Sequence, residues 1–331
     1  IFSKQTLKCF SEFLRHMSLS FVFPGQGSQI VGMGCEFIEA FPTAYQIMQE
    51  VDDALSQKLT KLILEGPIET LTLTENAQPA LLAISMAILK TLEKESGKTI
   101  SELASHLGGH SLGEYSALCA AGVFSIAQAV KLVRLRGEAM QKATPLGQGS
   151  MAAILGLELE AVEGLLGDVQ KPSHLCVIAN DNAPGQVVIS GHSEAVKQVI
   201  EKAVEAGAKR AILLPVSAPF HSPLMEPAAF VMKQALEETV LQDLHVPVIA
   251  NVTAMPIVGT AVLPGLLAQQ ITGRVRWRES VQTLAQLGCQ HVVEVGAGKV
   301  LTGLNKRIEP TLKTTNLNTP QDLETFLQEI A

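Results

Sequence analysis

The chain has 331 residues, of which 47% are hydrophobic, and its formal net charge is −7. That length accommodates one large domain and a smaller one, and the composition is typical of a globular protein rather than a disordered one. The negative charge comes without a dense basic cluster, and no apolar segment approaches the ~20 residues of a membrane-spanning helix, so neither a nucleic acid nor a membrane is expected as a partner.

Strand and helix patterns alternate from Met17 onward. Residues 1–16 precede this alternation, and we expect them to lie outside the fold, as an upstream extension of the reading frame rather than a targeting segment. The segments then predicted are a strand at 19–23, helices from about 31 and at 79–97, a strand at 103–109, and helices at 112–121 and 125–142. Such alternation predicts an α/β fold with a mostly parallel sheet.

The middle of the chain follows a different order. The predicted segments are a strand at 150–157, a helix at 158–166, strands at 174–180 and 185–191 joined by the turn DNAP, a helix at 193–206 with Val196, Val199, Ile200 and Val204 on its apolar face, and a strand at 209–216. This β-α-β-β-α-β order is ferredoxin-like. We therefore expect a small domain at 144–216, inserted into a large domain formed by 17–143 and 217–331.

The α/β pattern resumes after the small domain. Strands are predicted at 246–252 and 291–296, and helices at 264–271 and 279–287.

Cysteine and histidine usage limits the chemistry that we expect. The five cysteines are scattered without a C-x-x-C pair, which is typical of reduced thiols and predicts a cytoplasmic or similarly reducing location. The eight histidines show no spacing typical of metal ligands. We expect no metal site.

The segment GHSLG, residues 109–113, fits the G-x-S-x-G pattern of a nucleophile elbow. A strand is predicted before Ser111 and a helix after it, which is the context that this motif requires. The helix amides can stabilise a developing oxyanion, while Gly109 and Gly113 leave room for the tight turn. Ser111 is the predicted nucleophile.

A serine hydroxyl needs a base to remove its proton. His110 adjoins the serine, but neighbouring side chains at an elbow point in different directions. His221 lies between Pro219 and Pro223 in a connection that follows the small domain. We predict that His221 overhangs the cleft and acts as the base.

Arg136 shares the apolar stripe of its predicted helix with Ala129, Val133 and Met140. A buried arginine is costly unless it pairs with a carboxylate, and its planar fork suits bidentate binding of one. That carboxylate could belong to an internal Asp or Glu, or to a substrate such as a malonyl group.

Two glycine-rich turns complete the set of motifs. PGQGSQ, which follows the first strand, can supply a backbone amide to an oxyanion hole but lacks the nucleotide P-loop pattern, and VGAGKVL at 295–301 is interpreted as a structural turn.

Six segments in order, FVFPGQGSQ, GHSLGEYSAL, RLRGEAMQ, NDNAPGQVVISG, FHSPLM and EVGAGKVLTGL, resemble bacterial malonyl-CoA:acyl carrier protein transacylases of type II fatty acid synthesis. The resemblance runs from about Leu19 to near the C-terminus. It implies an α/β-hydrolase-like large domain with a ferredoxin-like insert. It also implies malonyl-CoA and a transient acyl carrier protein as partners, and no cofactor.

The resemblance also implies roles for individual residues. Ser111 becomes the acylated nucleophile and His221 its general base. Backbone amides of Gln26 and Leu112 form the oxyanion hole, and Arg136 binds the malonyl carboxylate.

A polar side chain or a backbone carbonyl, rather than an acid, orients the histidine in this family. The matching position is Gln270, or alternatively Gln269. Asn180 and Asn182 match asparagines near the cleft. Phe220, in FHSPLM, is expected to narrow the acyl pocket against an α-methyl branch, a feature shared with malonyl-selecting modules of polyketide synthases.

Three other functions stay open at this point. A polyketide pathway could use the same transfer, a serine esterase or thioesterase would not need Arg136, and an acyl-binding subunit would not become acylated. Docking of an acidic carrier protein calls for a basic surface. The candidates are Arg274, Arg276, Arg278, Lys299, Lys306 and Arg307.

Overall fold

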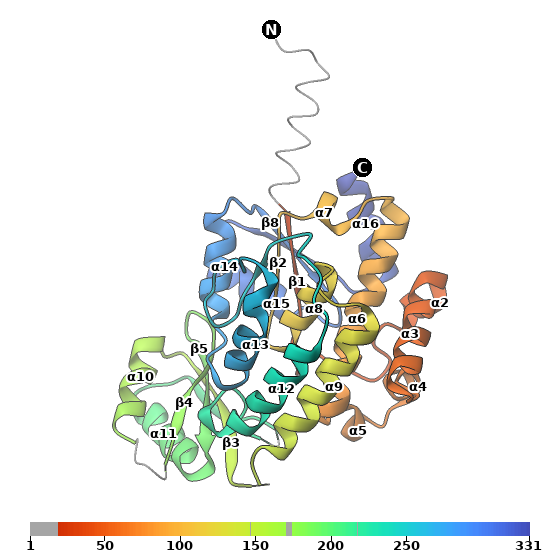
Figure 1. The fold of residues 1–331 in the computed structure, drawn as a ribbon. Coiled ribbons are helices and arrows are strands. Elements are labelled where there is room, and N and C mark those ends of the chain that lie inside the picture. The colour runs from red at the N-terminus through yellow and green to blue at the C-terminus, as the bar shows by residue number, and fades with distance from the viewer. Residues whose placement is uncertain (1–18, 146, 170–173, 217) are drawn as a thin grey trace.

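Two β-sheets organise the chain, and they lie in different parts of the molecule (Figure 1). The computed structural model describes residues 19–145, 147–169, 174–216 and 218–331, so the segment 1–16 lies outside the described residues. Sheet A has the strand order β7-β2-β1-β8-β9, and every pairing in it is parallel. Sheet B has the order β4-β5-β3-β6 and is antiparallel. The predicted α/β fold with a mostly parallel sheet is confirmed.

The register of sheet A brings three loops together. Phe23 of β1 lies opposite Gly109 of β2, and Gly108 lies opposite Ile249 of β7. Because parallel strands end at the same edge, the loops that follow these three strands meet there. The strands of sheet A are β1 (Leu19–Phe23), β2 (His106–Gly109), β7 (Val248–Ile249), β8 (His291–Val295) and β9 (Lys313–Leu317).

Helices cover both faces of sheet A, which explains why all five residues of β1 are buried. Phe21 and Phe23 face a core formed with α6, α8 and α9, whereas Val22 packs with Trp277 and Leu301 of α14 and α15. These helices are α6 (Thr74–Ser96), α8 (Leu112–Ala120), α9 (Ile126–Lys142), α14 (Trp277–Gln286) and α15 (Val300–Ile308).

Shorter elements complete the large α/β part. The helices are α2 (Cys35–Ala40), α3 (Pro42–Leu55), α4 (Leu59–Glu65), α5 (Ile68–Thr72), α7 (Ile100–Leu103), α12 (Glu226–Glu238), α13 (Leu263–Thr272) and α16 (Pro320–Ile330), with 3-10 turns at Pro223–Met225 and Thr260–Val262. None of the helices in the described part of the chain is both long and apolar enough to cross a membrane.

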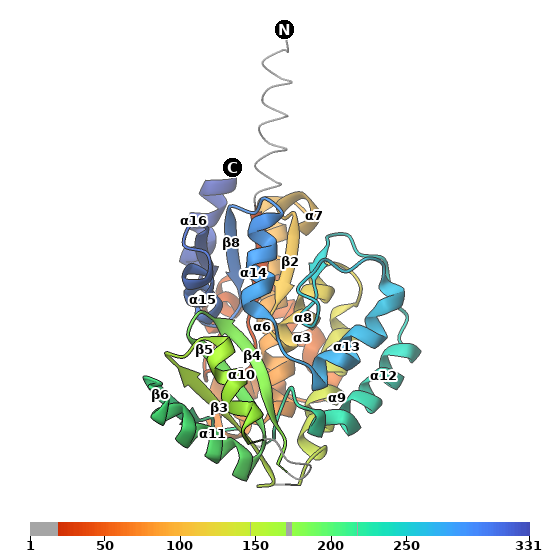
Figure 2. The ribbon, with the colours of Figure 1, turned by 90° about the vertical axis from the view of Figure 1, so that its left-hand side faces the viewer.

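Sheet B and its two helices form their own core, visible in Figure 2 at the lower left. Its elements follow the predicted order and are β3 (Gly149–Leu155), α10 (Leu159–Gly167), β4 (Cys176–Ala183), β5 (Gln186–His192), α11 (Ser193–Glu205) and β6 (Arg210–Leu213). Ala195, Val196, Val199 and Ala203 bury one face of α11. Val204 was expected on that face but is 58% exposed, because it lies about 100° around the helix from the fully buried Ala203.

Several expected boundaries were wrong, among them those of the strands predicted at 103–109 and 246–252, which are confined to β2 and β7 in the structure. The first helix starts at Cys35 rather than Val31, after glycines with positive φ at 32 and 34. Helix α6 begins at Thr74, so Pro79 lies inside it rather than at its start. Strand β4 continues through residue 183 with two register irregularities, so the turn is confined to Pro184 and Gly185 instead of DNAP.

Candidate active site

Ser111 occupies a strained turn between β2 and α8, with φ 54° and ψ −111°. A Cβ added to Gly109 would lie 1.9 Å from the carbonyl oxygen of Gly113, and one added to Gly113 would lie 2.2 Å from that of Phe23. Neither position accepts a side chain because the neighbouring atoms are backbone. The glycines therefore allow the turn that presents Ser111.

His221 lies directly against this serine. Its Nε2 is 2.7 Å from Ser111 Oγ, and its Nδ1 is 2.7 Å from the backbone carbonyl oxygen of Gln270. The carbonyl can only accept, so Nδ1 carries the proton and the Nε2 lone pair faces the hydroxyl. Burial, followed by the nearby charge of Arg136, lowers the pKa of His221 to about 3. The imidazole is neutral and able to take a proton.

Arg136 extends from α9 to the same serine. Its Nη2 donates to Ser111 Oγ at 3.0 Å and to Gln270 Oε1 at 2.8 Å, and its Nη1 donates to Gln78 Oε1 at 2.7 Å. The guanidinium lies 5.6 Å from the Tyr115 ring centre. Among the described residues, no ion pair includes Arg136. Its charge faces the cleft with only uncharged acceptors.

Gln270 connects these groups from α13. Its Nε2 donates to the backbone oxygen of Ser111 and to Glu114 Oε2, both at 2.8 Å. Gln269 is exposed, whereas Gln270 is buried. Of the two adjacent glutamines, only Gln270 contacts the site through both its backbone and its side chain.

Asn251 supports the elbow from the turn that follows β7. Its Oδ1 accepts from the Ser111 amide at 2.7 Å, and its Nδ2 donates to the Gly109 carbonyl at 2.7 Å. Its own amide donates to Glu114 Oε2 at 3.2 Å. Burial raises the pKa of Glu114 to about 7, although the N–H groups of Gln270 and Asn251 favour the charged form.

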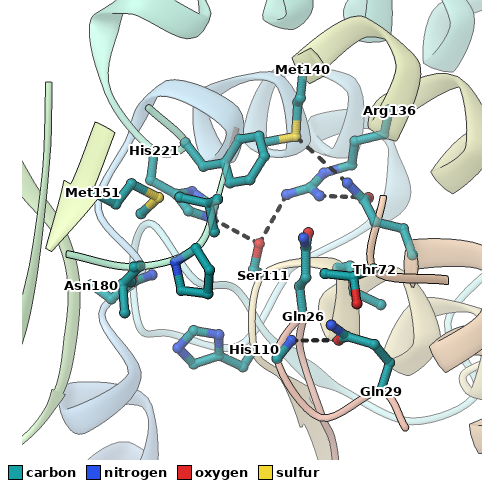
Figure 3. Close-up of a pocket in the computed structure, with 17 residues that line it drawn as sticks. Gln26, Gln29, Thr72, His110, Ser111, Arg136, Met140, Met151, Asn180 and His221 are labelled. Atoms are coloured by element: carbon teal, nitrogen blue, oxygen red, sulfur yellow. Dashed lines mark hydrogen bonds between the residues drawn. The ribbon is translucent and has the colours of Figure 1, made fainter. Parts of the chain in front are cut away.

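Ser111, Arg136 and His221 line a cavity of about 250 Å³, shown in Figure 3. The described residues that complete its lining are Gln26, Gly27, Gln29, Thr72, Gln78, His110, Leu112, Met140, Met151, Asn180, Leu214, Pro215, Val216 and Phe220. Sheet B contributes Met151 and Asn180 to the cavity, and the connection after β6 contributes residues 214–216. The loops after β1 and β2 and the helices of the large part contribute most of the other lining residues, so the cavity lies where the two parts of the molecule meet.

Most of the other residues predicted for the site also line this cavity. Gln26, Leu112, Asn180 and Phe220 all line it. Leu112 is the first residue of α8, so its amide has no acceptor within the helix. Asn182 does not line the cavity and reaches it through His110, whose Nε2 lies 2.8 Å from Asn182 Oδ1.

Three buried polar residues of the site were missed by the sequence analysis: Gln78, Glu114 and Asn251. Asn251 carried the clearest signal, since it is the second-last residue of the strand predicted at 246–252, near the edge where functional residues of α/β sheets gather. Gln78 and Glu114 lie within apolar helical stretches and gave no comparable signal.

All four arginines considered for carrier docking bind within the chain. Arg274 pairs with Glu163, Arg276 with Glu279 and Arg278 with Asp181. Arg307 donates to Gln186 Oε1 and to the carbonyl of Pro184. Their first role is to join parts of this molecule.

The fold and this serine–histidine–arginine site define an acyl transferase. The acyl transferase domain family matches residues 20–318, and the chain belongs to that family.

Individual relatives narrow the comparison. The chain is 47% identical over 312 residues to the malonyl CoA-acyl carrier protein transacylase of Bacillus subtilis, covering 94% of this chain and 97% of the relative. The acyl-carrier-protein S-malonyltransferase of Bartonella henselae has a similar crystal structure, with a TM-score of 0.92, 49% identity, and coverage of 95% and 99%. A malonyl-transacylase in complex with a type II polyketide acyl carrier protein gives a TM-score of 0.91 at 41% identity, covering 94% and 99%.

Proposed function

We propose that this chain is an [acyl-carrier-protein] S-malonyltransferase, which moves a malonyl group from malonyl-CoA to the phosphopantetheine thiol of an acyl carrier protein. The observation behind this proposal is the buried Arg136 guanidinium, which lies 3.0 Å from Ser111 Oγ without a carboxylate partner among the described residues. A buried cation with no carboxylate at ion-pair distance is costly, and a substrate carboxylate would relieve that cost. The named relatives support malonyl as the group transferred.

The first half-reaction acylates the enzyme. Ser111 Oγ attacks the thioester carbonyl while His221 Nε2 takes its proton, and the carbon–sulfur bond then breaks. The coenzyme A sulfur receives the proton from His221, leaving a malonyl ester on Ser111. The amides of Leu112, at the N-terminus of α8, and of Gln26, in the turn after β1, would stabilise the oxyanion.

The second half-reaction reverses these proton transfers. The carrier thiol gives its proton to His221 and attacks the ester carbonyl. The ester bond to Oγ breaks, and Ser111 recovers the proton. Coenzyme A leaves before the carrier reacts, so the kinetics are ping-pong.

Asn180 and Phe220 line the cavity and would bind and shape the acyl thioester, while Asn182 would act through His110. Met140, Met151 and Val216 make the remaining wall apolar. This wall and Phe220 favour an unbranched malonyl group. We assign the product to fatty acid synthesis rather than to a polyketide pathway, and we propose a cytoplasmic location, in keeping with the scattered cysteines.

We also propose the domain division 17–143 with 217–331, and 144–216. The antiparallel order β4-β5-β3-β6 supports a ferredoxin-like small domain, and the elbow between β2 and α8 supports an α/β-hydrolase-like large one.

Intact-mass measurement after mixing with malonyl-CoA tests the function. Wild-type protein is expected to gain one malonyl group, and Ser111→Ala none. Addition of the phosphopantetheinylated carrier should move the group to the carrier. An adduct lost to water at the same rate without a carrier would indicate a thioesterase. No adduct at all would indicate a non-catalytic acyl-binding protein.

A further inference from the structure

Glu114 is a buried carboxylate with no place in the reaction steps. It lies on α8, three residues after the nucleophile, and its residue is 1% exposed. No described Lys, Arg or His forms an ion pair with it. Its Oε2 instead accepts from Gln270 Nε2 at 2.8 Å and from the Asn251 amide at 3.2 Å. Burying the Glu114 carboxylate without an ion pair costs free energy, and this cost indicates a function that its contacts serve.

The carboxylate restricts how Gln270 can lie. An amide side chain has nearly the same shape in its two flipped orientations but exchanges donor for acceptor. An ionised carboxylate only accepts, as does the Ser111 carbonyl that Gln270 Nε2 also contacts at 2.8 Å. Both neighbours require the NH₂ group on their side. The Gln270 oxygen must therefore point the other way.

That oxygen meets Arg136. Arg136 Nη2 donates to Gln270 Oε1 at 2.8 Å, and Nη1 donates to Gln78 Oε1 at 2.7 Å. A flipped Gln270 would present its NH₂ group to the guanidinium, placing donor against donor. Arg136 would then lose one of its two amide acceptors and its fixed place beside Ser111 Oγ.

We propose that Glu114 is a positioning residue for selection of the acyl group: it fixes the Gln270 amide in one orientation and thereby aims Arg136 at the substrate carboxylate. This inference rests on the proposed malonyl transfer. Asn251 joins the same arrangement because it holds both Glu114 and the Ser111 amide. Glu114 itself does not line the cavity, and its carboxylate binds Gln270 and the Asn251 amide rather than Ser111 Oγ.

Glu114→Gln tests the proposal at pH 8, with kcat and KM measured for malonyl-CoA and acetyl-CoA. The substituted amide has almost the same shape but can donate as well as accept, so only the Ser111 carbonyl would still require the Gln270 NH₂ group on that side, and the flipped orientation of Gln270 becomes less costly. We expect the malonyl-to-acetyl ratio of kcat/KM to fall about tenfold, mainly through a higher KM for malonyl-CoA. An unchanged ratio in folded protein overturns the proposal.

Glu294→Gln is the matched control. Glu294 is another fully buried carboxylate, and it accepts from the amides of Leu301 and Thr302 at 3.1 and 2.7 Å, away from the cavity. This variant should lose stability while keeping the wild-type ratio. An equal fall of the ratio in both variants would mean that Glu114 has a merely structural role, and would overturn the proposal.

A double-mutant cycle with Gln270→Leu tests the route of the effect. Once the Gln270 amide is absent, Glu114→Gln should change the ratio less than about twofold. A full tenfold change in that background contradicts action through Gln270.

If Glu114→Gln does not fold, Glu114→Asp serves instead. Its carboxylate is expected to keep the malonyl-to-acetyl ratio within about threefold of wild type, and a tenfold fall of that ratio would oppose the proposal. Failure of malonyl transfer itself would appear separately, as wild-type protein without an adduct.

Discussion

Arg136 keeps its charge available because its buried partners are neutral. Two amide oxygens, from Gln78 and Gln270, satisfy its terminal nitrogens without cancelling the charge. A carboxylate in either position would form an internal ion pair and compete with the substrate. Selection of an acidic acyl group thus depends on glutamines as much as on the arginine.

Arg136→Ala is expected to lower kcat/KM for malonyl transfer about 100-fold, because a charge-assisted contact to the substrate carboxylate is lost. Acetyl transfer should gain relative to malonyl transfer, since acetyl needs no cation. Steady-state kinetics with both coenzyme A thioesters measures the two. Arg134→Ala, on the same helix, removes hydrogen bonds to Asn76 and Gln57 instead and should leave the preference intact. An unchanged preference in Arg136→Ala would contradict the carboxylate-binding role.

Among individual residues, the sequence predicted those whose chemistry can be inferred from their neighbours in the chain, without knowing their contacts in the fold. Ser111 was marked by its glycines, His221 by its prolines, and Arg136 by its place on an apolar stripe. The supporting polar residues could not be predicted in the same way, because their value depends on geometry. Glu114 cannot be distinguished from the other glutamates in the sequence, because its contacts with Gln270 and Asn251 exist only in the folded chain.

Among the elements, the contact of α9 with α6 determines where Arg136 enters the cavity. Gly137 follows the arginine and allows this contact. A Cβ there would lie 2.6 Å from Glu75 Cα and 2.7 Å from the Thr74 carbonyl oxygen. Backbone atoms cannot turn aside as a flexible side chain does, so α9 would have to move.

Gly137→Ala is accordingly expected to lower the free energy of unfolding by about 2 kcal/mol, as overpacking of a core typically does. Urea denaturation followed by circular dichroism measures the change. Gly164→Ala is the control, because it lies in α10 with nothing within 4 Å of the added atom. That substitution should raise stability by about 0.5–1 kcal/mol. Equal destabilisation of both variants would contradict the close-contact explanation.

Elements with a regular apolar period were predicted well, and irregular ones poorly. Helices α8 and α9 and the strands of sheet B lie close to their expected positions. Helix α6 was misplaced at its start because Pro79 is normally a first-turn residue. The predicted end of strand β4 was too early, because the residues Asp-Asn-Ala at 181–183 are typical of a turn in sequence, although they pair with β5 in the structure.

For the molecule as a whole, β4 provides one of the contacts that join the two parts. The Asp181 amide donates to the Val275 carbonyl at 3.0 Å, and the Asp181 carboxylate pairs with Arg278 Nε at 2.9 Å. The Asp181 side chain is fully buried, and the adjacent Asn180 lines the cavity. The ion pair therefore fixes one wall of the active site.

Arg278→Met is expected to destabilise the protein by about 3 kcal/mol, because it leaves the buried Asp181 carboxylate unpaired. Asp181→Asn in addition should restore much of the loss by removing the charge. Both effects are measured by urea denaturation. Lys313→Met breaks a more exposed pair with Glu329 and should cost less than about 1 kcal/mol. Similar losses for Arg278→Met and Lys313→Met would show that burial of Asp181 does not determine the cost.

The peptide carbonyl behind His221 also has a consequence for which acceptors can react. A neutral carbonyl supports the imidazolium less than a carboxylate does, and His221, with its pKa of about 3, is a weak base. A thiol ionises near pH 8.5, whereas bulk water has a pKa of 15.7, so activating water is harder by about 10 kcal/mol. A weak base can still serve a thiol. Of these two acceptors, the thiol therefore needs less help from His221, which favours transfer of the acyl group over its hydrolysis.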